Sequence, residues 1–169
     1  MADLFEVLIP SDDENFSVII PSAAPRGRFW SIDTATASVN GAHTAKLAAV
    51  SDLQILGFNG REVTATGLRT DAEILYDEGF ESYDKVDKEC SLSPMPDLLA
   101  VENDASSTYV SGTNPMTAVN DKVSFLAGKF HIAQTSEIAH YIVTAVETGT
   151  ASASYSRFTL KKLNGHAVA

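Results

Sequence analysis

The stretch that decides the fold is 122–163, which contains VSFLAGKFHIA (123–133), AHYIVTAVETG (139–149) and SYSRFTLKKL (154–163). These three runs are rich in Val, Ile, Phe, Tyr and Thr, whose branched or flat side chains suit a pleated sheet. Gly128 is expected to turn 123–126 back into 130–133. Phe158 and Leu160 alternate with polar neighbours, which is typical of a strand with one face in water. The last third of the chain therefore predicts antiparallel strands.

The rest of the chain gives further short apolar runs between turn residues. They are expected as strands at 26–32, 52–58, 74–76, 98–101 and 109–110, with 61–66 pairing back onto 52–58 as a hairpin and 45–50 as a strand or a short helix. About ten short strands without a long helix predict an all-β fold, a small β-barrel or sandwich of short antiparallel strands with an extended N-terminal arm. The arm is 1–25. The body is 26–169, as one barrel or as two lobes, 26–105 and 106–169.

The arm is predicted from two apolar runs that prolines interrupt. Residues 4–9 end at Pro10, and 16–20 end at Pro21, with Pro25 close behind. Proline removes a ladder hydrogen bond, so such runs suit a central strand poorly. Two alternatives stay open: the arm adds strands to the edge of another subunit, or it covers the core of its own chain.

Bulk composition indicates a globular, acidic chain. Its 169 residues are 44% hydrophobic and 20% charged, with a net charge of −10. The charge is uneven, because 1–104 hold 19 acids and 7 bases (−12) whereas 105–169 hold 3 acids and 5 bases (+2). An acidic surface repels phosphate backbones, so we expect no direct nucleic-acid partner. No stretch of the chain approaches about 18 apolar residues, and the N-terminus lacks a basic leader and a long apolar core. We therefore expect no membrane partner and synthesis as a soluble protein in the cytoplasm.

Motifs for chemistry are weak in this chain. His131 and His140 lie nine residues apart in strand-like runs, so we interpret them as buried, hydrogen-bonded histidines and not as zinc ligands. The acidic runs 12–14 and 77–78 lack the spacing of a calcium loop. Neither a nucleophile elbow nor a phosphate-binding loop occurs, and the single cysteine, Cys90, has no second cysteine to pair with. We therefore expect no catalytic residues, no metal and no cofactor.

Two sequence elements carry a resemblance to a known family. The first is LGFNGREVTAT (56–66), with Gly57, Phe58, Arg61, Val63 and Thr64. The second lies near the C-terminus and consists of Gly149, Arg157, Phe158 and Leu160. Their order resembles that of the head decoration, or capsid cement, proteins of tailed bacteriophages. The match covers about half of the chain, and the stretches 33–50 and 102–115 depart from it.

The resemblance implies a structural protein and not an enzyme. It implies attachment to the major capsid protein on the outside of a phage head, synthesis in the bacterial cytoplasm, and a homo-oligomer, with a trimer favoured. The apolar residues of the arm are the expected capsid interface: Phe5, Val7, Leu8, Ile9, Val18, Ile19 and Ile20. Two other classes stay open, namely another β-rich virion component (tail tube, connector or fibre) and a carbohydrate-binding β-domain.

Overall fold

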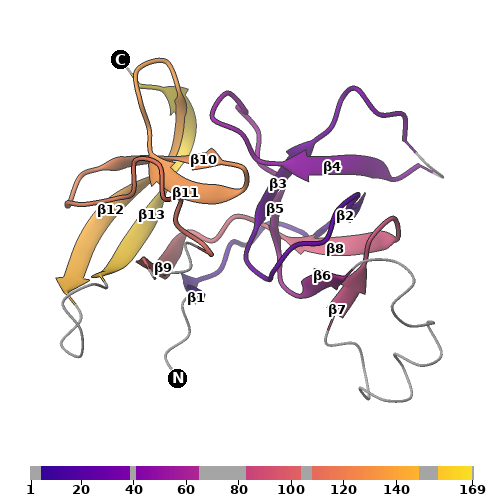
Figure 1. The fold of residues 1–169 in the computed structure, drawn as a ribbon, viewed down its shortest axis with the longest axis horizontal. Coiled ribbons are helices and arrows are strands. Elements are labelled where there is room, and N and C mark those ends of the chain that lie inside the picture. Colours follow the sequence, from indigo (N-terminus) through magenta and orange to yellow (C-terminus); the bar gives the residue numbers. More distant parts are fainter. Residues whose placement is uncertain (1–4, 39–40, 65–82, 104–107, 149–155, 169) are drawn as a thin grey trace.

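A computed structural model describes residues 5–38, 41–64, 83–103, 108–148 and 156–168. Every regular element in these ranges is a strand (Figure 1). The strands are β1 (Phe5–Ile9), β2 (Phe16–Ile19), β3 (Phe29–Ile32), β4 (His43–Leu47), β5 (Gly57–Asn59), β6 (Glu62–Thr64), β7 (Tyr83–Lys85), β8 (Glu89–Ser93), β9 (Leu98–Asn103), β10 (Lys122–Leu126), β11 (Lys129–Ile132), β12 (Ile138–Thr148) and β13 (Ser156–Ala167). The predicted all-β fold is confirmed. Within these ranges no helix has the length and apolar character needed to cross a bilayer.

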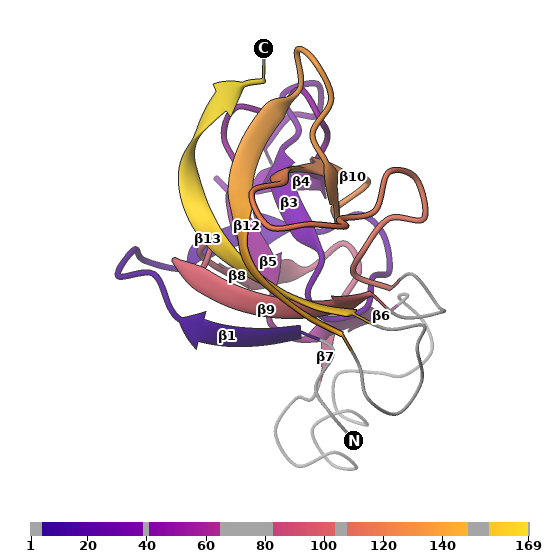
Figure 2. The same cartoon turned by 90° about the vertical axis from the view of Figure 1, so that its left-hand side faces the viewer.

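The strands form two main sheets that lie side by side (Figures 1 and 2). One sheet has six strands in the order β1-β9-β13-β12-β10-β11, and the other is a closed barrel in the order β2-β4-β3-β5-β8. A parallel pair, β6 and β7, forms a third, small sheet. Most of the pairs in the two main sheets are antiparallel, and β2 with β4 is the parallel exception.

The six-stranded sheet is built on the stretch that the sequence identified first. The hairpin β10–β11 turns at Gly128, which has a positive φ of 73°, and Phe125 faces Phe130 across it. Strands β12 and β13 pair along most of their lengths, with Val143 opposite Leu160. Their inward side chains, Tyr141 and Phe158 among them, pack together in one apolar core. The predicted antiparallel strands are confirmed here.

The barrel has a second core, and β3 joins the two. Trp30 packs with Val18, Ile20 and Leu92 inside the barrel, while its neighbour Phe29 packs in the core of the six-stranded sheet. Successive residues of a strand point to opposite faces, so one short strand supplies a large side chain to each core. Backbone hydrogen bonds also link the sheets, including Phe29 N to Gly128 O at 3.1 Å and Ile138 N to Val50 O at 2.8 Å.

The expected domain boundaries need correction. Within the expected arm 1–25, the described residues 5–25 are not a separate arm, because β1 pairs with β9 and β2 pairs with β4 and β8. The lobes are not 26–105 and 106–169 either, since the six-stranded sheet combines β1 and β9 with β10–β13. Prolines bracket these N-terminal strands without entering them, so each strand keeps its ladder hydrogen bonds.

Three local predictions also differ from the structure. Of the expected strand 52–58 only 57–58 is in a strand, β5, and β6 pairs with β7 instead of returning onto β5. For 45–50, expected as a strand or a short helix, the strand alternative is confirmed at 45–47, which belong to β4. At 109–110 there is a single bridge from Val110 to Phe130. The expected strand 74–76 lies outside the described residues.

Candidate functional site

The seven predicted interface residues separate into three groups by burial. Phe5, Val18 and Ile20 are fully buried in the chain's own cores. Val7 and Ile19 are half-buried. Only Leu8 and Ile9 are well exposed, at 40% and 51%. Two alternatives were open for this segment. The buried residues cover the core of their own chain, and of the seven predicted interface residues only Leu8 and Ile9 are exposed enough to contact a partner.

Leu8 and Ile9 lie at the end of an edge strand. Strand β1 is the first strand of the six-stranded sheet and pairs only with β9 among the described strands. The register shifts between Val7 and Ile9, so Leu8 lies at an irregularity of the ladder. Such bulges re-aim side chains at sheet edges. Here the result is two consecutive apolar side chains that both face solvent.

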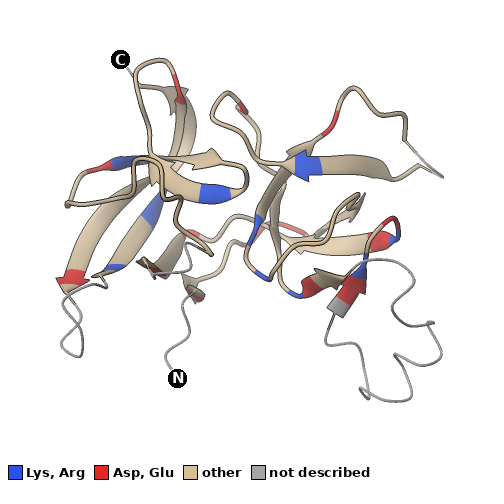
Figure 3. Cartoon of the chain, in the orientation of Figure 1, with Lys and Arg blue, Asp and Glu red and all other residues tan. Residues whose placement is uncertain are grey.

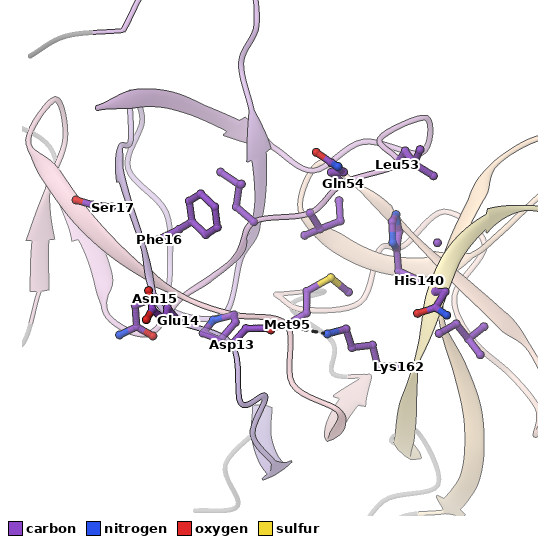
Figure 4. A pocket seen from close by; sticks show the side chains of 16 residues that line it. Asp13, Glu14, Asn15, Phe16, Ser17, Leu53, Gln54, Met95, His140 and Lys162 are labelled. Atoms are coloured by element: carbon purple, nitrogen blue, oxygen red, sulfur yellow. Dashed lines mark ion pairs between the residues drawn. The ribbon is translucent and has the colours of Figure 1, made fainter. Parts of the chain in front are cut away.

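A groove lies between the barrel and the six-stranded sheet (Figure 4). It has a volume of about 680 Å³. Phe16 stands on its barrel wall and Leu53 on the other side, with Met95 between them. Phe16 is 49% exposed and Leu53 is 62% exposed. A second hollow of about 280 Å³ adjoins it, because both are lined by Asp13, Asn15 and Pro94.

One wall of this groove is an unpaired strand edge. Strand β13 extends to Ala167, but β9 accompanies it only as far as the pair Lys161–Leu98. Before Leu98 the chain contains Pro94 and Pro96, and both hollows lie against this stretch. Tyr141 holds the diverging chain in place, since its hydroxyl donates to the Pro96 carbonyl at 2.8 Å. Beside 163–167, on the side where β9 has ended, no described strand is present.

The adjacent ladder between β12 and β13 is irregular at the same place. Ala139 faces His166 and Tyr141 faces Lys162, so His140 stands opposite three residues of β13. Gly165 fits closely in this bulge, because a Cβ there would lie 3.0 Å from the His140 ring and 3.1 Å from the Leu53 carbonyl oxygen. The bulge turns 163–165 toward the groove, where all three residues line the wall.

Charges divide unevenly across the groove. Figure 3 shows the acidic positions of the described chain in red and the basic positions in blue. Asp12, Asp13 and Glu14 are consecutive and exposed, and the last two line the barrel wall. Lys162 is the basic residue of the lining, and its Nζ lies 3.8 Å from Asp13 and 3.9 Å from Asp97. Lys162 is thus already shared between two carboxylates, which leaves the barrel wall with excess negative charge.

The two strand histidines are buried, as expected, but differ in their contacts. His140 Nε2 lies 2.8 Å from the backbone carbonyl of Asp52. A carbonyl only accepts, so this nitrogen carries the proton. His131 Nε2 lies 3.2 Å from a Glu137 carboxylate oxygen, yet neither of its ring nitrogens has a hydrogen bond of good geometry. The expected hydrogen bond is confirmed for His140 alone.

Burial lowers the pKa of both of these histidines. Cys90 is buried in the barrel core. Burial, followed by the charge of Asp84, raises the pKa of its thiol to about 11. Because the thiolate is the reactive form, Cys90 is an inert core residue at neutral pH. Among the described residues, no group of three His, Cys, Asp or Glu side chains lies close enough together to bind a metal ion. The acidic pair 77–78 lies outside the described residues.

Sequence reasoning named Leu8 and Ile9 but not the groove. The signals for the groove were present in the sequence. They are Phe16, which closely follows the acidic run 12–14, and two prolines, Pro94 and Pro96, which follow a strand. What joins them is long-range pairing, which the local pattern does not contain. No protein-family model, curated protein or solved structure matches this chain.

Proposed function

We propose that this protein is a structural virion protein that binds the outside of a tailed-phage capsid and stabilises contacts between major capsid protein subunits. Two things support the proposal. The order of Gly57, Phe58 and Arg61 before Arg157, Phe158 and Leu160 resembles that of decoration proteins. The observation that carries it is structural: edge strand β1 presents Leu8 and Ile9 to solvent.

An edge strand with exposed apolar side chains is a ready interaction surface. Its unpaired N–H and C=O groups can accept a strand of another chain. Burial of the exposed parts of Leu8 and Ile9 would contribute apolar surface at about 25 cal/mol per Å². The interface is thus narrower than the seven residues first expected, because Phe5, Val18 and Ile20 already stabilise the chain itself.

Binding of this kind stabilises a shell by linkage. A protein that binds the assembled lattice, and not free subunits, adds its binding free energy to the lattice. A trimer presenting three β1 edges would bind more tightly than one edge, because the later contacts are intramolecular. The acidic charge of the first 104 residues is compatible with an exterior position, away from packaged nucleic acid.

The test is binding to expanded, empty heads assembled from the major capsid protein of the same phage. Purified protein is mixed with heads and imaged by cryo-electron microscopy, and affinity is measured by co-sedimentation. We expect density on the outer surface. The double substitution Leu8→Ser and Ile9→Ser is expected to weaken binding about tenfold or more, since it removes two apolar contacts.

The matched control is Val119→Ser. Val119 is 48% exposed, similar to Ile9, but lies outside β1 and outside both hollows. It should bind heads as the unaltered protein does. Heads that stay bare would overturn the proposal. Stacked rings of the protein alone would indicate a tail-tube role instead, and selective binding on a glycan array would indicate a carbohydrate-binding domain.

A further inference from the structure

The groove occupies the space in which a further strand would lie. Strand β13 is a member of a six-stranded sheet. Its pairing with β9 ends at Lys161, and the last backbone contact on that side is from Lys162 N to Asp97 O at 3.0 Å. Leu163, Asn164 and Gly165 on that edge line the groove. An extended chain placed there would continue the sheet in the position of β9. Addition of a strand to an exposed edge is a recurrent mode of peptide recognition, in which main-chain hydrogen bonds contribute affinity.

The groove also provides a place for an apolar side chain. Phe16 and Leu53 face it from opposite sides, and Met95 lies between them (Figure 4). Both of the outer side chains are about half exposed or more. Solvent-exposed Phe and Leu around a concave site are typical of a surface that a partner covers. Methionine adapts its shape to the occupant because its side chain is unbranched and polarizable.

The charge of the groove walls favours a bound segment of opposite charge. Asp13 and Glu14 stand on the barrel wall, next to Phe16. Lys162 neutralises part of this charge but also pairs with Asp97. A Lys or Arg beside the apolar side chain of the partner would meet Asp13 and Glu14, whereas an acidic neighbour would be repelled.

We propose that the groove binds an extended segment of a partner protein, which pairs with 163–167 of β13, places an apolar side chain between Phe16 and Leu53, and sets an adjacent Lys or Arg against Asp13 and Glu14. This inference adds a second binding surface to the proposed function. It rests on the proposed function only for the identity of the partner, the major capsid protein. The adjoining hollow beneath 10–15 lengthens the site, as an elongated ligand requires.

The experiment uses the full chain and an array of random octapeptides with acetylated and amidated ends, which removes their terminal charges. We expect selection of an apolar residue next to Lys or Arg. A selected peptide is then measured by fluorescence anisotropy. Phe16→Ser or Leu53→Ser should weaken its binding about tenfold. The double change Asp13→Asn and Glu14→Gln should weaken it about two- to fivefold at low salt.

Two control substitutions match these changes. Val119→Ser removes an equally exposed apolar side chain away from the groove, and Glu62→Gln removes an exposed carboxylate of β6 that is not in the lining. Neither should alter peptide affinity. Amide hydrogen exchange gives the readout specific to strand pairing: the bound peptide should slow exchange in 163–167.

Several results would overturn the inference. They are an array without enrichment, enrichment of acidic peptides, affinity that the groove substitutions leave intact, or unchanged exchange in 163–167. Selective binding of glycans with no peptide selection would identify a sugar site instead. The two proposals fail separately, because head binding is tested through Leu8 and Ile9 and peptide binding through Phe16 and Leu53.

Discussion

At the scale of single residues, the backbone of Gly57 is determined by a strand that is distant in sequence. Gly57 pairs with Trp30 of β3 and has a φ of +147°, which other residues rarely adopt. A Cβ at this position would overlap the backbone carbonyl of Ser93. The residue is therefore glycine for two reasons, its conformation and the close approach of the end of β8.

We expect Gly57→Ala to lower the free energy of unfolding by about 3 kcal/mol or more, because strain at φ adds to a backbone overlap. Chemical denaturation measures the loss. The control is Gly41→Ala, where φ is +85° but no atom lies within 4 Å of the added Cβ. That change should cost about 1 kcal/mol. Equal losses for both would show that the carbonyl of Ser93 moves aside without cost.

Asn59 shows what a local pattern cannot predict. The sequence indicates Asn59-Gly60 as a simple turn, whereas the Asn59 side chain is buried and fully hydrogen-bonded. Its Oδ1 accepts from Arg28 N and Trp30 Nε1, at 3.0 and 2.9 Å. Its Nδ2 donates to the carbonyls of Pro25 and Arg61. Three of these four partners lie about thirty residues away, so only the folded chain brings them together.

At the scale of elements, sequence reasoning succeeds where the partner of a strand is its neighbour along the chain. The hairpin β10–β11 and the pair β12–β13 were predicted, because their alternation and turn residues are local. It fails for β6, which pairs with β7 across a long connection. It also fails for β1, whose partner β9 begins at Leu98. A proline-bracketed run predicts an arm, but only the pairing decides whether the arm is free.

The burial of Phe5 yields a prediction for strand β1. Phe5 is fully buried and its ring lies 5.1 Å from that of Phe58 and 5.6 Å from that of Tyr109. We expect Phe5→Ala to destabilise the fold by about 3–5 kcal/mol, as for other buried aromatic residues. Ile9→Ala, on the same strand but half exposed, should change stability by about 0.5 kcal/mol. Urea denaturation followed by tryptophan fluorescence measures both.

The same argument gives a prediction for truncation of the N-terminal segment. Removal of 1–20 would leave a folded body only if this segment were a free arm. Because it supplies Phe5 to one core and Val18 and Ile20 to the other, we expect the truncated chain to unfold. A truncated protein with an unchanged melting temperature would contradict this description of β1 and β2.

At the scale of the whole molecule, the two sheets form one folding unit. Phe29 and Trp30 serve different cores from one strand, and the segment 48–53 bonds to the six-stranded sheet through Ala48, Val50 and Asp52. The sequence indicated one barrel or two lobes, but it could not indicate that β3 is common to both cores. The groove arises at this junction, which is why no local motif predicted it.

The junction also contains a buried titratable group. His140 donates from Nε2 to the Asp52 carbonyl, and burial lowers the pKa of His140. The carboxylate of Asp52 accepts hydrogen bonds from Ser31 and from the backbone of Ala49. Burial opposes its ionisation, but hydrogen bonds from Ser31 and Ala49, together with Lys46, outweigh burial and lower its pKa below 3.8. Asp52 therefore stays ionised between pH 5 and pH 7.

These pKa directions predict how stability depends on pH. A histidine whose pKa is lower in the folded than in the unfolded protein binds more protons when unfolded. Stability is then full above the unfolded pKa of about 6.5 and declines as pH falls below it. His131 acts in the same direction. We expect the free energy of unfolding, and with it the melting temperature, to fall between pH 7 and pH 5. The slope of the free energy is at most about 1.4 kcal/mol per pH unit for each histidine.

Substitution of His140 by Gln separates the contribution of this histidine from the rest. An amide keeps a donor for the Asp52 carbonyl but does not titrate, so the stability of the variant should decline less steeply from pH 7 to pH 5. Val119→Ser, which removes no titratable group, should keep the original slope. An NMR titration of the unaltered protein gives a second measurement, in which the His140 ring should stay neutral below pH 6.5. A protonated ring at that pH, or a steeper decline in the variant, would contradict the assignment of His140 as a buried neutral donor between the two sheets.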